Sequence, residues 1–331
     1  MNVAAFNRIL TVAFFAILFI LPLVNSDSYI RHISIIAIMY AVLVSSWNVT
    51  LGYGGVFNFG HMAFFAIGAY ATGVMTKTFD VSPWWGMPIG VVAAVIASVI
   101  VCLPVLRLKG IYVILVTFAF AQLCLQIVLN QRDLTGGNFG LVSIPPLEIG
   151  AFSFRDFQNA GYYYLALLLL VVTLLAMLWF RRSHFGRSVI AFRDNEAYAI
   201  SRGLPLAKVR LMTFMFSAVF PGAVGSVYAQ YVRSASPDMF GFSFLTLALS
   251  MLLLGGVGTI WGPIAGAFVF TIISELLTPL GPGRYLVTAT LIVLVLRFFP
   301  GGLAGIPEFI GQLLKGRSEV TGDPAMLKDE K

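Results

Sequence analysis

The segment GRSVIAFRDNEAYAISRGLP, residues 186–205, is a polar interruption deep inside a chain that is otherwise mostly apolar. It lies between the apolar runs 161–180 and 206–231. Its charged side chains would each be costly in hydrocarbon, so the segment must lie outside a bilayer. They are Arg187, Arg193, Asp194, Glu196 and Arg202. The pattern predicts two membrane spans joined by a polar segment.

The same segment predicts a short helix. Asp194 or Asn195 can cap its start, and the run 196–202 is compatible with a helix. Gly203 stands where a left-handed residue commonly ends a helix. At 1.5 Å per residue the helix has roughly two turns and is about 10–12 Å long. Such a helix between two spans is suited to dock against a partner outside the membrane.

The composition indicates an all-α polytopic membrane protein. Of 331 residues, 59% are hydrophobic and 11% are charged, whereas average proteins are roughly a quarter charged. Because a span needs roughly 20 apolar residues, the apolar runs predict about ten transmembrane helices. The net charge of +7 is attributed to basic cytoplasmic loops and not to nucleic-acid binding. The predicted spans are 9–24, 30–51, 57–76, 84–106, 110–130, 161–180, 206–231, 243–258, 262–279 and 283–299.

Two regions, 51–76 and 251–271, are rich in glycine and are expected to form broken or re-entrant helices. A bilayer tolerates such bare backbone only where protein or a water-filled cavity surrounds it. The sequence GGV occurs at 54–56 and again at 255–257, which leaves open whether the two halves of the chain are duplicated. The first apolar run, 9–24, is interpreted as an uncleaved helix rather than a signal peptide.

The distribution of basic residues orients the spans. If residues 181–205 face the cytoplasm and the spans alternate, 15 of the 21 basic residues lie inside. This is the bias expected of a membrane protein, and it places both termini in the cytoplasm. The predicted organisation is a membrane domain over residues 1–300, with a cytoplasmic loop at 181–205, followed by a polar cytoplasmic tail at 301–331.

The sequence has none of the patterns of a catalytic or cofactor site. Its three histidines are scattered, and Cys102 and Cys124 lie in apolar spans, where neither a disulfide nor a metal site is indicated. No Walker-type loop or dinucleotide fingerprint occurs, so the chain has no means of cleaving ATP by itself. Glu275, the only acid well inside an apolar run, is thin support for an ion-coupled carrier. We therefore expect no enzyme activity, no cofactor and no metal.

Neutral polar residues are the candidates for a solute path. Gln122, Gln126 and Asn130 recur at four-residue spacing and share one face of a helix. They either line a path or join helices through hydrogen bonds. Asn58 and His61 lie where glycine-rich backbone begins a new helix, whose free N–H groups would attract a carboxylate. Alternatively, Asn58 only caps that helix.

Four blocks in order make the chain resemble the permease subunits of ATP-binding-cassette importers for branched-chain amino acids, in the longer of two permease types. The resemblance covers most of residues 30–300. The blocks are GYGGVFNFGHMAFFAIGAYATG at 52–73, LTGGNFGL at 134–141, GRSVIAFRDNEAYAISRGLPLAKVRLMTFMFSA at 186–218, and the region from Ser236-Pro237 through LLLGGVGTIWGPIAGA at 252–267.

The resemblance implies a role for the polar segment. Glu196, Ala197 and Ala199, with Gly203 seven residues after the acid, match the cytoplasmic loop that forms a coupling helix in that family. The coupling helix sits in a groove of an ATPase subunit, so ATP-driven movement reaches the membrane spans. Arg193, Asp194 and Asn195 open this helix and belong to the same predicted site. Tyr198 departs from the family pattern, which more often has a small residue there.

By the same resemblance, the partners are a second related permease, two cytoplasmic ATPase subunits and an external solute-binding protein, in a prokaryotic plasma membrane. The expected solutes are leucine, isoleucine and valine. Related systems carry urea, short amides or aromatic acids, and these remain alternatives. An autonomous channel or an ion-coupled carrier is the rival from another functional class.

Overall fold

The computed structural model describes residues 3–24, 27–149 and 152–281, together with 283, 287, 289, 290, 293, 297 and 301–305. Most of the predicted span 283–299 and most of the predicted tail 301–331 lie outside the described residues. The described part is a helical bundle, and five of its helices are long and apolar enough to cross a membrane. These are Ser28–Tyr53, Pro83–Val105, Ile111–Asn130, Asn159–Arg182 and Leu206–Val232.

The helices follow the predicted spans closely. The α-helices are α1 (Val3–Val24), α2 (Ser28–Asn48), α3 (His61–Lys77), α4 (Pro83–Val105), α5 (Ile111–Asn130), α6 (Arg132–Thr135), α7 (Asp156–Arg182), α8 (His184–Asp194), α9 (Glu196–Ser201), α10 (Leu206–Val232), α11 (Phe242–Gly255) and α12 (Trp261–Leu276). A π-helix, η1 (Val49–Tyr53), continues α2. Short 3₁₀ turns are η2 (Gly137–Phe139), η3 (Pro237–Phe240), η4 (Thr278–Leu280) and η5 (Leu303–Gly305).

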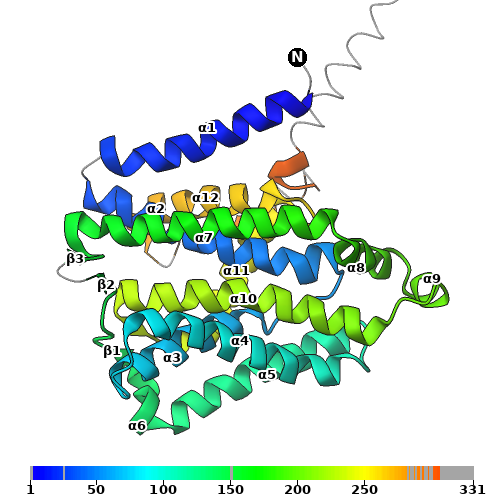
Figure 1. Cartoon of the computed structure of the whole chain (residues 1–331), viewed down its shortest axis with the longest axis horizontal. Coiled ribbons are helices and arrows are strands. Elements are labelled where there is room, and N and C mark those ends of the chain that lie inside the picture. The colour runs from blue at the N-terminus through cyan, green and yellow to red at the C-terminus, as the bar shows by residue number, and fades with distance from the viewer. Residues whose placement is uncertain are drawn as a thin grey trace, which may run out of the picture.

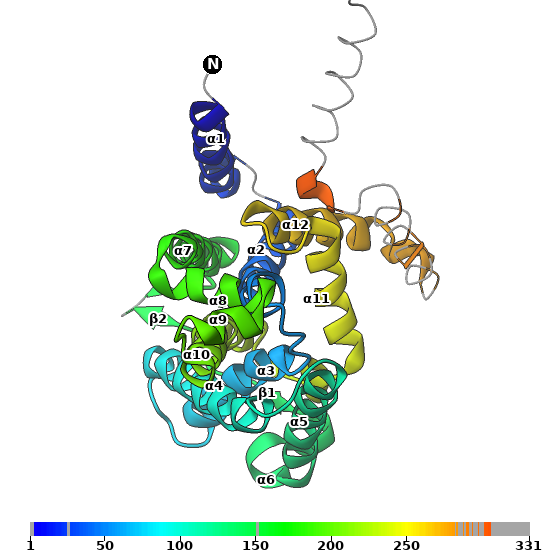
Figure 2. The same cartoon turned by 90° about the vertical axis from the view of Figure 1, so that its right-hand side faces the viewer.

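The long helices lie side by side, with α8 and α9 at one end of the bundle and the short strands at the other (Figure 1). At the strand end, β1 (Leu141–Val142) pairs with β4 (Ser234–Ala235), and β2 (Glu148–Ile149) pairs with β3 (Phe152–Ser153). In the view onto the α8–α9 end, α1 and α5 lie on opposite sides of the bundle (Figure 2). The polar segment therefore lies at one tip of the bundle.

Close helix packing in the core depends on small residues. α10 packs along α3 and α4, and Gly68 of α3 lies directly against Gly222 of α10. Ser226 donates from Oγ to the carbonyl oxygens of Gly222 (2.8 Å) and Gly68 (3.2 Å). A Cβ at Gly225 would overlap the carbonyl oxygen of Phe65. Without side chains at these positions the backbones approach closely, as in other membrane bundles.

Both predicted helix interruptions are present, and the second lies against η1, which leads into the first. The first follows η1 at residues 54–60, and the second separates α11 from α12 at residues 256–260. Asn48, at the end of α2, holds the second: its Nδ2 donates to the Thr259 carbonyl oxygen (2.6 Å), and its Oδ1 accepts from the Gly258 N–H (2.8 Å). A Cβ at Gly52 would overlap Asn48 Oδ1, so glycine is needed for this approach.

One helix was not predicted. Residues 184–194 form α8, whereas the sequence predicted a helix only within the later part of the polar segment. The N-cap of α8 lies outside that segment, because Ser183 Oγ accepts from the Gly186 N–H (3.0 Å). Gly186 and Val189 are buried on one face of α8 while Arg187 is exposed on the other. The charged residues thus belong to an amphipathic helix.

Glu275 lies in the last turn of α12. Its carboxylate accepts a hydrogen bond from the hydroxyl of Tyr29, in the first turn of α2. A hydrogen bond to a neighbouring helix accounts for this acid without an ion relay.

Replacing Gly225 with alanine should lower the thermal stability of the detergent-solubilised protein by several degrees, because overpacking costs about 1–3 kcal/mol. The matched control is Gly283→Ala, at a helical glycine where an added Cβ meets nothing within 4 Å. Thermal unfolding followed by aggregation measures both. Equal melting temperatures for Gly225→Ala and the wild type would contradict the packing of α10 on α3.

Candidate functional site

The short helix α9 is capped at both ends by the residues that the sequence indicates. Of the two candidate caps, Asn195 is the one used: its Oδ1 accepts from the Tyr198 N–H (3.0 Å). At the other end Gly203 has φ +83°, in the left-handed region, and donates its N–H to the Ile200 carbonyl oxygen (2.8 Å). The Leu204 N–H reaches the Ala199 carbonyl oxygen (3.2 Å), which closes the turn.

One face of α9 is exposed and partly apolar. Tyr198 is 55% exposed and Ile200 is 47% exposed, whereas Ala199 is buried. Tyr198 is not free to rotate away, because the guanidinium of Arg202 donates to its hydroxyl through Nη2 (2.6 Å) and Nε (3.0 Å). The same guanidinium lies 5.1 Å from the centre of the tyrosine ring. The exposed face is therefore ordered.

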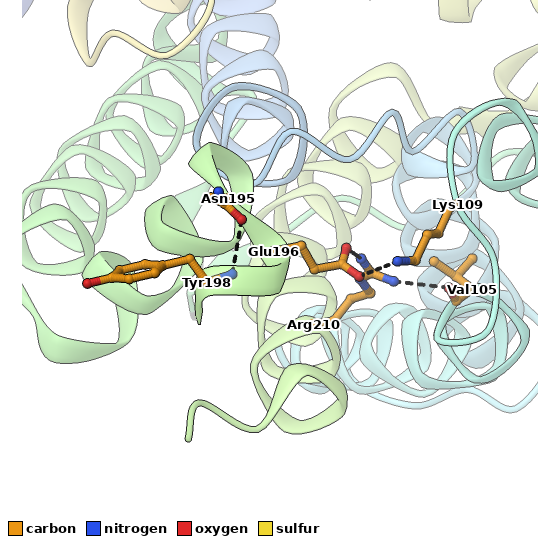
Figure 3. A network of polar contacts seen from close by, with 6 residues as sticks. All are labelled: Val105, Lys109, Asn195, Glu196, Tyr198 and Arg210. Atoms are coloured by element: carbon orange, nitrogen blue, oxygen red, sulfur yellow. Dashed lines mark hydrogen bonds and ion pairs between the residues drawn. The ribbon is translucent and has the colours of Figure 1, made fainter. Parts of the chain in front are cut away.

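Glu196 turns inward, towards its own chain (Figure 3). Its Oε1 pairs with Lys109 Nζ (2.8 Å), from the α4–α5 connection, and its Oε2 pairs with Arg210 Nη2 (3.3 Å), from α10. Arg210 Nη1 also donates to the Val105 carbonyl oxygen (3.4 Å) at the end of α4. One carboxylate thus fastens α9 to the α4–α5 connection and to α10, and Arg210 extends the network to α4.

These contacts lower the pKa of the Glu196 carboxyl below its usual value. The largest cause is the hydrogen bond from Lys109, partial burial opposes it, and the charge of Arg210 adds to the lowering. A carboxylate with a lowered pKa stabilises the folded state above its unfolded pKa, and this contribution is lost as the pH falls through the folded value. The attachment of α9 is therefore weakened by acid.

Arg193 and Asp194 are the last two residues of α8, and only Asn195 separates them from α9. Asp194 Oδ1 accepts from Arg193 Nε (3.0 Å) and Nη2 (2.9 Å). The remaining end of the guanidinium, Nη1, donates to the carbonyl oxygen of Gly52 in η1 (3.1 Å). Arg193 therefore joins the polar segment to the first helix interruption, a contact between residues 141 positions apart.

A cavity of about 620 Å³ lies beneath this segment. Its walls come from the first interruption (54–57), the α4–α5 connection (108–111), the turn between α8 and α9 (192–196), and α10. Most of the lining is apolar, and its charged residues are Lys109, Arg193, Asp194, Glu196 and Arg210. The cavity therefore lies between the polar segment and the bundle, and the ion pairs of Glu196 and the hydrogen bond from Arg193 to Gly52 connect the two.

Asn58 and His61 are fully buried around the start of α3. Asn58 Oδ1 accepts from the Gly60 N–H (3.0 Å), in the turn before the helix. The His61 ring is stacked on Trp47 (5.7 Å between centres, 4° between planes), and its Nε2 lies 3.1 Å from Ser46 Oγ. Asn58 Nδ2, His61 Nδ1 and Trp47 Nε1 have no hydrogen-bond partner among the residues that the structure describes. Asn58 therefore caps the turn through its Oδ1, while its Nδ2 donor has no partner among the described residues.

Gln122, Gln126 and Asn130 lie on α5, where Gln122 is half-buried and the other two are exposed. Within the described residues, no hydrogen bond joins any of these three side chains to another helix. The hydrogen bond between α5 and the 58–60 turn is made by Thr117, whose Oγ1 accepts from the Phe59 N–H (3.0 Å). Among the described residues, the three amides therefore do not join helices.

Sequence reasoning did not single out Lys109, Arg210, Gly52 or Asn48, which hold the site together. Lys109 and Arg210 are basic residues near span ends, and such residues are common in any membrane protein. No local pattern marks them as partners of Glu196. Across the described residues, no group of three or more His, Cys, Asp or Glu side chains could hold a metal ion.

Comparison with known proteins identifies the family. A family model described as a branched-chain amino acid transport system permease component matches residues 29–296. The chain belongs to this family. It is 30% identical over 292 residues to the high-affinity branched-chain amino acid transport system permease protein LivM of Escherichia coli K12, covering 82% of this chain and 69% of that protein.

More distant relatives include a probable LivM permease of Methanocaldococcus jannaschii, 26% identical over 326 residues, with 82% of this chain and 91% of that protein covered. The LivH permease of E. coli K12 is 27% identical over 290 residues, which cover 81% of this chain and 92% of that protein. No solved structure matches the chain. Family membership and the apolar helices together make it a multi-pass inner-membrane permease of branched-chain amino acid transport.

In the permease, backbone amides of residues 197–204 should lose protection from hydrogen exchange as the pH falls below about 4.3, the ordinary pKa of glutamate, because the lowered pKa of Glu196 keeps its ion pairs intact above that pH. In Glu196→Gln the same amides should be poorly protected throughout, without this pH dependence. Protection factors from mass spectrometry, corrected for intrinsic exchange, measure both. Glu148→Gln, at the strand end, serves as control. Wild-type protection in Glu196→Gln at pH 7 would contradict the role of the ion pairs.

Proposed function

We propose that α9 is the coupling helix through which separate ATPase subunits drive this permease. The observation that carries the proposal is the exposed face of α9, where Tyr198 and Ile200 stand out at the tip of the bundle. Ordered apolar side chains on a helix outside the hydrocarbon are best explained by a protein partner. On its other face, Glu196 fastens the helix to α10 and the α4–α5 connection.

The proposed assembly contains this chain, a second related permease, two cytoplasmic ATPase subunits and an external solute-binding protein. Similarity to both LivM and LivH supports a permease partner. In the proposed topology about ten helices span the membrane, including residues 283–299. Both termini and the loop 181–205 lie in the cytoplasm, in line with the bias of basic residues.

The proposed solutes are leucine, isoleucine and valine, supported by the names of the relatives. Urea, short amides and aromatic acids are the alternatives within the family. The path is proposed to pass Asn58 and His61, whose unused polar atoms at the start of α3 could meet a carboxylate. Gln122, Gln126 and Asn130 would line its side towards the second permease, since they have no partner helix in this chain.

The proposed topology predicts that position 200 is reached only from the cytoplasm. In a Cys102→Ser, Cys124→Ser background, Ile200→Cys should react with a membrane-impermeant maleimide in inside-out vesicles and not in right-side-out vesicles. Added ATPase subunits should slow the labelling, because they cover α9. Ser153→Cys, at the strand end, is the control and should react from the other side. Labelling of position 200 from outside would refute the coupling role.

Gly203 offers a second test, because only a few residues adopt its left-handed conformation. Gly203→Val should cost about 1–2 kcal/mol in this conformation and strongly reduce ATP-driven leucine uptake, with membrane insertion unchanged. Gly203→Asn should retain most uptake, because asparagine tolerates that conformation. Both are measured in proteoliposomes with the full complex. Equal uptake by the two variants would contradict the proposal.

A separate measurement tests the rival function. Solute flux through the permease in liposomes without ATPase subunits would support an autonomous channel.

A further inference from the structure

Arg193 lies where the polar segment meets the interrupted helices. Asp194 Oδ1 accepts from two nitrogens of its guanidinium, which fixes the plane of the group. The third nitrogen, Nη1, is thereby aimed at the Gly52 carbonyl oxygen in η1 (3.1 Å). The aliphatic part of the side chain lies against Gly55, where a Cβ would come within 2.8 Å of Arg193 Cγ. The backbone of the first interruption therefore leaves room for this arginine.

The contact continues into the second interruption. Gly52 is four residues after Asn48, whose side chain holds the backbone of Gly258 and Thr259. A Cβ at Gly258 would lie 3.7 Å from the Gly52 oxygen and 3.8 Å from Arg193 Nη1, so all three groups meet at one point. The backbone from Asn48 to Gly52 thus receives Arg193 from the end of α8 on one side and holds the break between α11 and α12 on the other.

We propose that Arg193 is a positioning residue that transmits movement of α8 and α9 to the two paired helix breaks. This inference rests on the coupling role proposed for α9. Breaks between helices and π-helical turns are the points where a helical bundle bends most readily. A planar guanidinium held by a carboxylate keeps its direction, so displacement of the α8–α9 turn displaces the Gly52 carbonyl. Because the helices are closely packed and stiff, the rest of each helix moves together with the displaced backbone.

Arg193→Lys is the test, because lysine keeps the charge and loses the fork that binds Asp194 and Gly52 together. In proteoliposomes with the full complex, leucine uptake per ATP hydrolysed should fall about tenfold, as expected when a contact of a charged donor worth about 1.4 kcal/mol is lost. Assembly with the ATPase subunits, measured by co-purification, should be unchanged. Arg187→Lys, at an exposed arginine of the same helix, is the control and should leave the ratio unaltered.

A second readout separates transmission from simple stabilisation. Phe57 lies in the first interruption and is 47% exposed, so Phe57→Cys in the cysteine-free background reports on that backbone. Its labelling rate should differ at least threefold between the nucleotide-free complex and the complex trapped with ATP and vanadate. Adding Arg193→Lys should abolish this difference. Asn48→Ala should do the same, and the two changes should not be additive.

Three results would overturn the inference. They are a parallel fall of uptake and ATP hydrolysis in Arg193→Lys, loss of assembly with the ATPase, or a labelling difference at position 57 that survives the substitution. Failure of the proposed function looks different. In that case the wild-type complex itself shows no ATP-driven uptake, or position 200 is labelled from outside.

Discussion

The requirement that every buried backbone group find a partner shapes this permease more than any other constraint. Within hydrocarbon a helix satisfies its own N–H and C=O groups, and an interrupted helix does not. The chain has two glycine-rich interruptions, and it resolves the problem by placing them together. Asn48 supplies both a donor and an acceptor to the second break, and glycine at position 52 allows the backbones to approach. The pairing brings residues separated by about two hundred positions to one point near the tip of the bundle.

Two kinds of contact hold the rest. Along the bundle, glycine and alanine surfaces of α3, α4 and α10 interlock, and such contacts are close-packed and stiff. At the tip, α9 has six residues and buries only Ala199, so packing alone cannot hold it. Its position depends on Glu196, and ion pairs that are partly exposed contribute little each and are screened by salt. The position of α9 can therefore change more easily than the packing of α3, α4 and α10.

Local chemistry in the sequence was enough to predict part of this arrangement. Glycine predicted the two interruptions, and Asn195 and Gly203 marked the ends of α9, as the structure confirms. That residues 186–205 lie outside the membrane stays a prediction from their charge. The local pattern could not show which side chains contact each other in the folded chain. Lys109 and Arg210 meet Glu196 only after α4, α5 and α10 have packed, and four-residue spacing placed Gln122 and Gln126 on one face without saying what that face meets. Helix α8 was not predicted, because its N-cap residue, Ser183, lies before the polar segment. Its charged residues also obscure the amphipathic pattern to which buried Val189 belongs.

The contrast between a stiff bundle and an adjustable tip bears on how a permease without ATP-cleaving motifs can be driven. In the proposed coupling role, a displacement of α9 cannot be absorbed by compressing close-packed helices, since their interiors yield little. The displacement has to appear where the backbone is least constrained, and in the described residues that place is the backbone around Gly52 and Gly258. Arg193 connects the end of α8 directly to this backbone. An adjustable surface helix and a deformable backbone, joined by one fixed contact and flanked by rigid helices, are what the proposed transmission requires.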